Sequence, residues 1–208
     1  MAKHCVLMML SVFVVAALLH ADGPSDNHPD KVRPVPPPGI KIDEADRGKL
    51  QAGVDTLGKQ IERLRHELKA KPALLELLPD VQIFHNAVRY ALTYNEFYGK
   101  NEVAIARKLL AHGLERAEQL RAGKTPWTTA TGLIVRGYQS KIDGSVQPYG
   151  LVVPSSYQAN SPYEHRLDIW CHGRGEKLTE LSFLNGRLSS PGQFTPKHAF
   201  VLHLYGRY

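Results

Sequence analysis

The chain has 208 residues, of which 43% are hydrophobic, enough for one large domain or two small ones with a substantial core. The formal net charge is +6, but residues 43–122 hold 13 Lys and Arg against 12 Asp and Glu, and residues 123–208 hold 9 against 5. This spread contains no basic run that could follow a phosphate backbone, so it excludes nucleic acid as a partner. The ten histidines lack the spacing of metal ligands, so the sequence predicts neither a metal nor a cofactor.

Residues 1–21 are typical of a secretory signal peptide. A short positive start precedes the apolar run Cys5–Leu19, and Ala21 offers a cleavage site. The run is shorter than the ~20 residues that span a bilayer as a helix, which favours a cleaved signal over a permanent anchor. We therefore expect a secreted, periplasmic or cell-envelope protein with no stable membrane span. Because Cys5 would leave with the signal, Cys171 has no partner for an internal disulfide.

Residues 22–42 form a predicted linker that is rich in proline. Its prolines are Pro24, Pro29, Pro34, Pro36, Pro37 and Pro38. Such a composition favours an extended, polyproline II-like chain, so we expect a spacer without a packed core.

Apolar residues then recur at spacings of three and four, which predicts three amphipathic helices at about 44–70, 80–97 and 101–122. Each apolar stripe needs a partner, so residues 43–123 are predicted to form a small antiparallel helical bundle. The expected role of this bundle is packing or interaction, without chemistry of its own. Each helix carries one histidine, and these are His66, His85 and His112.

The pattern changes to strands after the third helix. Two strand-like runs, about 130–141 and 146–153, flank an Asp-Gly turn signal and predict an antiparallel hairpin. The runs Leu167–Cys171 and Ala199–Leu204 are separated by 27 residues, enough for a helical crossover between parallel strands. The last run is almost continuously apolar, as is typical of a strand buried on both faces. The predicted fold class is α/β: a helical segment, then a hairpin that leads into parallel strands.

The stretch LDIWCHGRGEKLTE places His172, Gly173, Arg174 and Gly175 directly after the third predicted strand. One explanation is a tight turn between a strand and a helix. The other is a loop whose backbone N–H groups face the negative charge that develops during acyl transfer. Glycine lets the backbone approach a substrate and adopt conformations closed to other residues, and α/β sheets bind ligands at the carboxyl ends of strands. We expect His172 to shape this loop rather than to catalyse.

Residues 131–208 resemble the start of an α/β-hydrolase domain of the prolyl-oligopeptidase-like serine peptidase or esterase type. The resemblance lies in SKIDGSVQPYGLVVP, then LDIWCHGRGE, then HAFVLHLYGRY. It implies that residues 130–208 begin an incomplete, truncated hydrolase sheet, and that His172, Gly173, Arg174 and Gly175 form an oxyanion-hole loop. The motif differs from the commoner His-Gly-Gly-Gly at Arg174. No G-x-S-x-G nucleophile elbow occurs in the chain, so the resemblance implies that nucleophile, acid and base lie beyond residue 208.

The leading hypothesis is therefore the N-terminal part of an exported serine hydrolase that acts on a peptide or ester substrate, with this stretch inactive alone. The alternative is a non-enzymatic envelope interaction protein with a helical module on a small α/β support. A third is an intact pseudo-hydrolase scaffold. A G-x-S-x-G in the downstream reading frame would distinguish the first from the others.

Overall fold

The computed structural model describes residues 35–160 and 162–206. Two compact units divide the chain, Met1–Pro37 and Pro38–Tyr208, and all the helices and strands given below belong to the second. The predicted signal peptide and most of the predicted linker lie outside the described residues. Within those residues, no helix combines the length and the apolar character needed to cross a membrane.

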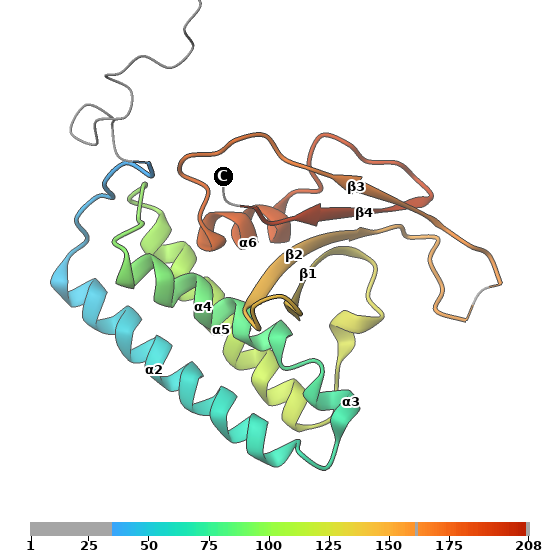
Figure 1. The fold of residues 1–208 in the computed structure, drawn as a ribbon, viewed down its shortest axis with the longest axis horizontal. Coiled ribbons are helices and arrows are strands. Elements are labelled where there is room, and N and C mark those ends of the chain that lie inside the picture. Colours follow the sequence, from blue (N-terminus) through green and yellow to red (C-terminus); the bar gives the residue numbers. More distant parts are fainter. Residues whose placement is uncertain (1–34, 161, 207–208) are drawn as a thin grey trace, which may run out of the picture. The chain divides into compact units, whose positions relative to one another are not determined.

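Three long helices form the first layer: α2 (Glu44–Glu67), α4 (Pro79–Thr93) and α5 (Glu102–Arg121). They run antiparallel in turn, down, up and down in the view of Figure 1, and each contacts the other two. The apolar stripe predicted for α2 is buried, and its members are Leu50, Val54, Leu57, Ile61 and Leu64. The predicted antiparallel helical arrangement is thus present.

The ends of these helices follow local chemistry. Helix α4 ends at Thr93, four residues earlier than expected, because Asn95 has a φ of 54°, which no helix can contain. Pro72, between the first two predicted helices, begins the short helix α3 (Pro72–Leu75). The fixed φ of proline suits the first turn of a helix, where its missing N–H has no partner to lose.

A four-stranded mixed sheet forms the second layer, so the α/β class is correct. The strands are β1 (Gly132–Gln139), β2 (Val146–Val153), β3 (Arg166–Trp170) and β4 (Ala199–Leu204), in the order β1-β2-β4-β3. Strand β2 is antiparallel to both β1 and β4, whereas β3 and β4 are parallel. Helix α6 (Glu180–Ser189) makes the crossover between the parallel pair, as the 27-residue spacing predicted.

The helices cover only one face of the sheet. Helices α4 and α6 both contact β1 and β2, and the inward-facing Val201 of β4 is 1% exposed. The alternate residues of β4 are not buried: Phe200 and Leu202 are partly exposed, and Leu204 is 39% exposed. The expectation that this strand is buried on both faces is therefore wrong for the described residues, because the face away from α4 and α6 has no covering layer there.

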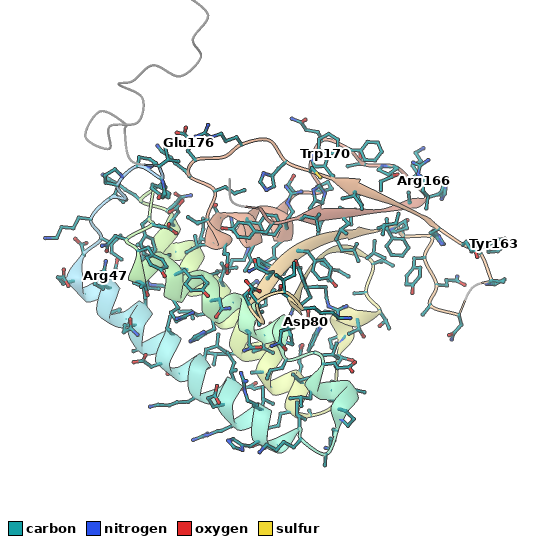
Figure 2. The ribbon with its side chains drawn as sticks, in the orientation of Figure 1. Arg47, Asp80, Tyr163, Arg166, Trp170 and Glu176 are labelled. Carbon is teal, nitrogen blue, oxygen red and sulfur yellow. The ribbon has the colours of Figure 1, made fainter. Side chains whose placement is uncertain are left out.

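A buried carboxylate joins the two layers. Asp80, in the first turn of α4, is fully buried and accepts hydrogen bonds from the Trp127 indole, the Arg136 guanidinium and the Gly137 amide. Figure 2 shows Asp80 in the interior between helices and sheet. Arg116 of α5 donates to the carbonyl oxygens of Asp80 and of Val135 in β1. We call these residues the Asp80 network; the segments 43–123 and 130–208 share it and pack into one compact unit.

The last residues of the predicted linker also belong to this unit. Ile42 is only 6% exposed, and the Ile40 amide donates to the Phe97 carbonyl oxygen at 2.7 Å. Gly39 lies so close to the Asn95 carbonyl that any side chain there would collide with it. Residues 39–42, at the end of the predicted spacer, therefore pack against the helical layer.

Candidate functional site

The loop predicted to carry chemistry lies between the carboxyl end of β3 and helix α6. His172 is exposed, and its ring spans two backbone groups. Its Nδ1 lies 2.7 Å from the Gly173 carbonyl oxygen, and its Nε2 lies 3.3 Å from the Gly206 amide nitrogen. Since the Gly206 amide can only donate, Nε2 accepts and Nδ1 carries the proton that it donates to Gly173. These bonds fasten the loop to the segment that follows β4.

The two glycines of the loop leave backbone N–H groups open. Neither Gly173 nor Gly175 adopts a positive φ, so the expectation that they take conformations closed to other residues is wrong. A methyl group at Gly173 would meet nothing within 4 Å, and one at Gly175 would lie 3.1 Å from the Leu178 Cβ. Within the described part of the chain, neither glycine amide donates a hydrogen bond.

The tight turn begins only at Gly175, the last residue of the HGRG sequence. The Leu178 amide donates to the Gly175 carbonyl oxygen at 3.0 Å, which closes a turn over residues 175–178. Helix α6 then starts with a capping box, in which Thr179 and Ser182 each bond the backbone N–H of the other. The loop is thus held at both ends, by the His172 ring and by the turn that leads into α6. The Arg174 side chain is 65% exposed and lies 3.7 Å from the Glu176 carboxylate, a weak pair at the surface.

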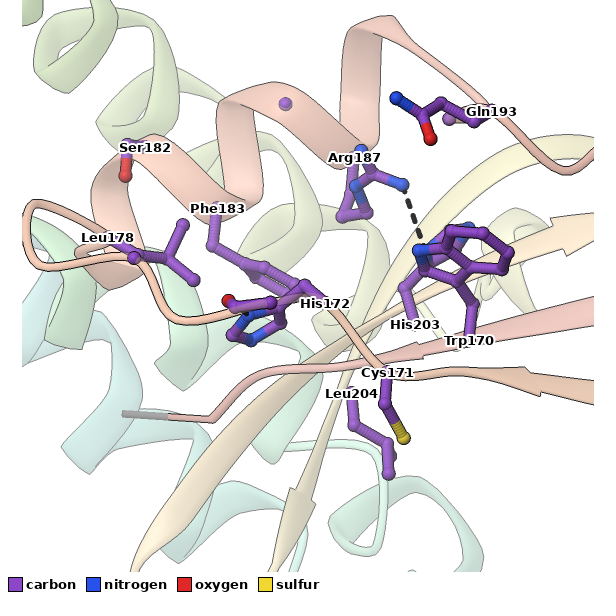
Figure 3. A pocket seen from close by; sticks show the side chains of 14 residues that line it. Trp170, Cys171, His172, Leu178, Ser182, Phe183, Arg187, Gln193, His203 and Leu204 are labelled. Carbon is purple, nitrogen blue, oxygen red and sulfur yellow. Dashed lines mark hydrogen bonds between the residues drawn. The ribbon is translucent and has the colours of Figure 1, made fainter. Parts of the chain in front are cut away.

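A cavity of about 550 Å³ opens between this loop, helix α6 and the end of β4 (Figure 3). Its walls are largely apolar, and the side chains that give them this character are Trp170, Leu178, Phe183 and Leu204. Of the predicted site residues, His172, Gly173 and Gly175 line the cavity, whereas Arg174 lines a neighbouring hollow beside Gly206. The structure thus brings three of the four predicted residues to this cavity, and all four to the neighbouring hollow beside Gly206.

An arginine and a histidine that the sequence did not single out form the polar part of the cavity. Nη1 of Arg187, on α6, lies 3.1 Å from Nδ1 of His203, on β4. An arginine can only donate, so Nδ1 of His203 accepts, and its Nε2 donates to the Pro191 carbonyl oxygen at 3.1 Å. This arrangement requires a neutral imidazole. Burial, reinforced by the Arg187 charge, lowers the pKa of His203, while the Pro191 contact raises it.

Two glycines make room for Arg187. A methyl group at Gly150 of β2 would lie 2.6 Å from Cγ of Arg187, and one at Gly192 would lie 3.2 Å from Nη1. Gly192 also has a φ of 90°, a conformation that glycine adopts without strain. The sequence therefore marks this site only by Gly150 and Gly192. Their role cannot be recognised without knowing that Arg187 packs against them.

A second cluster lies at the opposite end of the parallel strands. The Ser156 hydroxyl lies 3.4 Å from Nε2 of His165 and 3.4 Å from Nδ1 of His198, in segments that precede β3 and β4. Both contacts are at the surface, and among the described residues no carboxylate hydrogen-bonds to either ring. A serine between two histidines without an orienting acid falls short of a catalytic triad.

Other candidate sites are less developed. His85 packs 3.2 Å from the position of a methyl group at Gly58, and His112 lies beside the Phe84 ring, so the helical histidines face different neighbours. Within residues 35–160 and 162–206, no group of three or more His, Cys, Asp or Glu side chains could hold a metal. No family model, curated protein or solved structure matches this chain.

Proposed function

We propose that this chain is the N-terminal part of an exported serine hydrolase, a peptidase or an esterase, and that it supplies half of the oxyanion hole. One observation carries the proposal: Gly173 and Gly175, whose amides donate no hydrogen bond within the described residues, line the cavity at the carboxyl end of β3. Acyl transfer places a negative charge on the substrate carbonyl oxygen, and preorganised N–H groups are the usual means of stabilising it.

The place of the loop in the fold supports this role. In α/β-hydrolases one oxyanion donor comes from the loop between the third strand and the next helix, and the other follows the nucleophile. Here HGRG follows β3, the third strand, and precedes α6. Ligands of α/β sheets bind at this edge, outside the carboxyl ends of the strands.

The surface of the sheet supports the idea that further elements complete the domain. Strand β3 lies at the edge of the sheet, and its Leu167 and Ile169 are 53% and 60% exposed. An edge strand of this composition would pair readily with another strand. We assign that place to a strand that leads to the nucleophile, since a G-x-S-x-G elbow occurs nowhere in residues 1–208.

The experiment is activity-based labelling of the natural protein with a fluorophosphonate, which reacts with nucleophilic serines. We expect the label on a G-x-S-x-G serine in the same polypeptide as β1 to β4, and no label on the 208-residue chain made alone. N-terminal sequencing of the same material should start near Asp22. Absence of label from the natural protein, or an intact Met1 on a cytosolic product, would contradict the proposal.

One observation favours the non-enzymatic alternative, an envelope interaction protein. The sheet face away from α4 and α6 bears a shallow apolar hollow lined by seven side chains, namely Tyr138, Tyr149, Leu151, Leu167, Phe200, Leu202 and Leu204. A contiguous apolar patch of this kind also suits a protein partner. A natural protein that ends after Tyr208, takes no label and purifies with a second protein would favour this alternative.

A further inference from the structure

The cavity beside the HGRG loop holds a positive charge with no negative counterpart. Its lining contains Arg187 but no Asp or Glu. Among the described residues, the only hydrogen-bond partner of the Arg187 side chain is Nδ1 of His203, and no carboxylate forms an ion pair with it. A guanidinium has five N–H donors, so most of its hydrogen-bonding capacity is left for a ligand.

The Arg187 side chain is also held in place before any ligand arrives. Its stem lies over Gly150, its head lies next to Gly192, and the neutral His203 ring fixes one nitrogen. Burial lowers the pKa of Arg187, the direction expected where desolvation is not offset by a nearby anion. An arginine fixed in this way loses little side-chain entropy when it binds, which favours bidentate recognition of a planar anion.

The remaining lining indicates what kind of anion fits. Besides Arg187 and its partner His203, the polar side chains of the lining are His172, Ser182 and Gln193; the rest of the wall is largely apolar and includes the Trp170 and Phe183 rings. A phosphate dianion would find one cation and few donors, whereas a singly charged carboxylate with an apolar body matches one guanidinium and two rings.

We propose that this cavity binds a small organic carboxylate, with Arg187 as its charge partner and Trp170 against its apolar part. Only the source of that carboxylate rests on the proposed function: in a hydrolase it would be part of the substrate, such as the free carboxyl end or an acidic side chain of a peptide. Binding itself is a property of the described residues and is measured on this chain.

Proton–nitrogen correlation spectra give a direct test, because the chain has two tryptophans with different surroundings. Trp170 lines the cavity, whereas Trp127 is 6% exposed and its indole N–H donates a hydrogen bond to Asp80. Phenylpropionate should move the Trp170 indole signal saturably and leave the Trp127 signal unchanged. Its neutral amide and inorganic phosphate should each bind at least about tenfold more weakly, since the amide has no charge for Arg187 and phosphate has no apolar body for the rings.

Matched variants assign the charge partner. Arg187→Met should weaken phenylpropionate binding by about tenfold or more, and Arg166→Met, on an exposed arginine at the far end of β3, should leave it unchanged. An unshifted Trp127 signal verifies that each variant is folded. Equal affinity for the acid and its amide, or undiminished binding by a folded Arg187→Met protein, would overturn the proposal.

A second pair of variants covers the case in which Arg187→Met does not fold. Gly186 lines the cavity within α6, and a side chain there would meet nothing within 4 Å. Gly186→Glu brings a carboxylate next to Arg187, and Gly186→Gln is its neutral match. Phenylpropionate should bind the Glu variant at least about tenfold more weakly than the Gln variant, and equal behaviour of the two refutes the role of Arg187. Loss of fluorophosphonate labelling with intact carboxylate binding would remove only the hydrolase proposal.

Discussion

Replacing Asp80 by Asn should remove a large part of the stability of the chain. The carboxylate is fully buried and receives the Trp127 indole N–H at 2.9 Å, the Arg136 Nε–H at 2.9 Å and the Gly137 amide at 2.7 Å. An asparagine has the same shape but turns one oxygen into an NH₂ group. Because all three partners are donors, at least one of them would then face another donor.

The cost follows from the charges left behind. Arg136 is 20% exposed, and Arg116 lies 4.9 Å from the Phe84 ring and 5.1 Å from the Trp127 ring. Burial lowers the pKa of Arg116 to about 10, whereas the Asp80 charge opposes that change. Without Asp80, both guanidinium groups lose their buried counter-charge. Breaking such a pair costs about 3–5 kcal/mol, out of about 5–15 kcal/mol for a whole domain.

Urea and thermal unfolding, followed by circular dichroism, measure the effect. A loss of about 3–5 kcal/mol should lower the Tm by roughly 6–20 °C for a chain of this size. Asp168→Asn is the matched control, because Asp168 pairs with the exposed Arg166 at the surface, where ion pairs contribute about 0–1 kcal/mol. An Asp80→Asn protein within about 1 kcal/mol of the parent would refute the assignment of Asp80 as the joint between the layers.

The remaining predictions concern the loop, pH and close backbone contacts. In the proposed complete hydrolase, Gly173→Pro would delete one N–H donor and should lower kcat by about 10²–10³ with a smaller change in KM, while Gly173→Ala should not; steady-state kinetics on esters and peptides measures this. His85, His112 and His203 all have pKa values lowered from 6.5, chiefly by burial. The unfolded chain therefore takes up protons first as the pH falls, so stability should be constant above about pH 7 and decrease below about pH 6.5; a Tm that stays level down to about pH 5 contradicts this. Gly137→Ala should destabilise the fold by about 1–3 kcal/mol, because its methyl group would lie 2.3 Å from the Pro79 carbonyl oxygen. Gly48→Ala, on the open surface of α2, should stabilise the fold by up to about 1 kcal/mol. Melting curves equal to that of the parent protein would contradict both.

Most of the regular elements could be predicted because their signals are local. The stripe of α2, the turn with Gly144 at a φ of 72° and the 27-residue crossover each depend on neighbours in the sequence. The Asp80 network could not be predicted in this way. Asp80 and Arg136 are 56 residues apart, and in the sequence Asp80 is only a helix-start residue. Nothing local distinguishes a capping carboxylate from one that joins two layers.

The candidate site shows the same division between local and distant signals. The loop after β3 could be located from four adjacent residues, yet its glycines turned out to be ordinary in φ. Arg187 and His203 were not predicted, since one occupies a helical position and the other alternates with apolar residues in a strand. Their contact depends on the strand order, which places β4 next to both β2 and β3.

The helical layer contributes to the candidate site because it supports helix α6. Helix α6 holds the cavity between the HGRG loop at its start and Arg187 near its end, so its position fixes the distance between the two. Leu181 and Leu184 fix that position: both are completely buried, and α6 contacts α4 and α5. An oxyanion hole loses its effect when its donors move, because its benefit comes from dipoles that need not reorient. In the proposed hydrolase, the packing of α6 on the helices would supply the rigidity that such a loop requires. The Asp80 network in turn fastens those helices to the sheet.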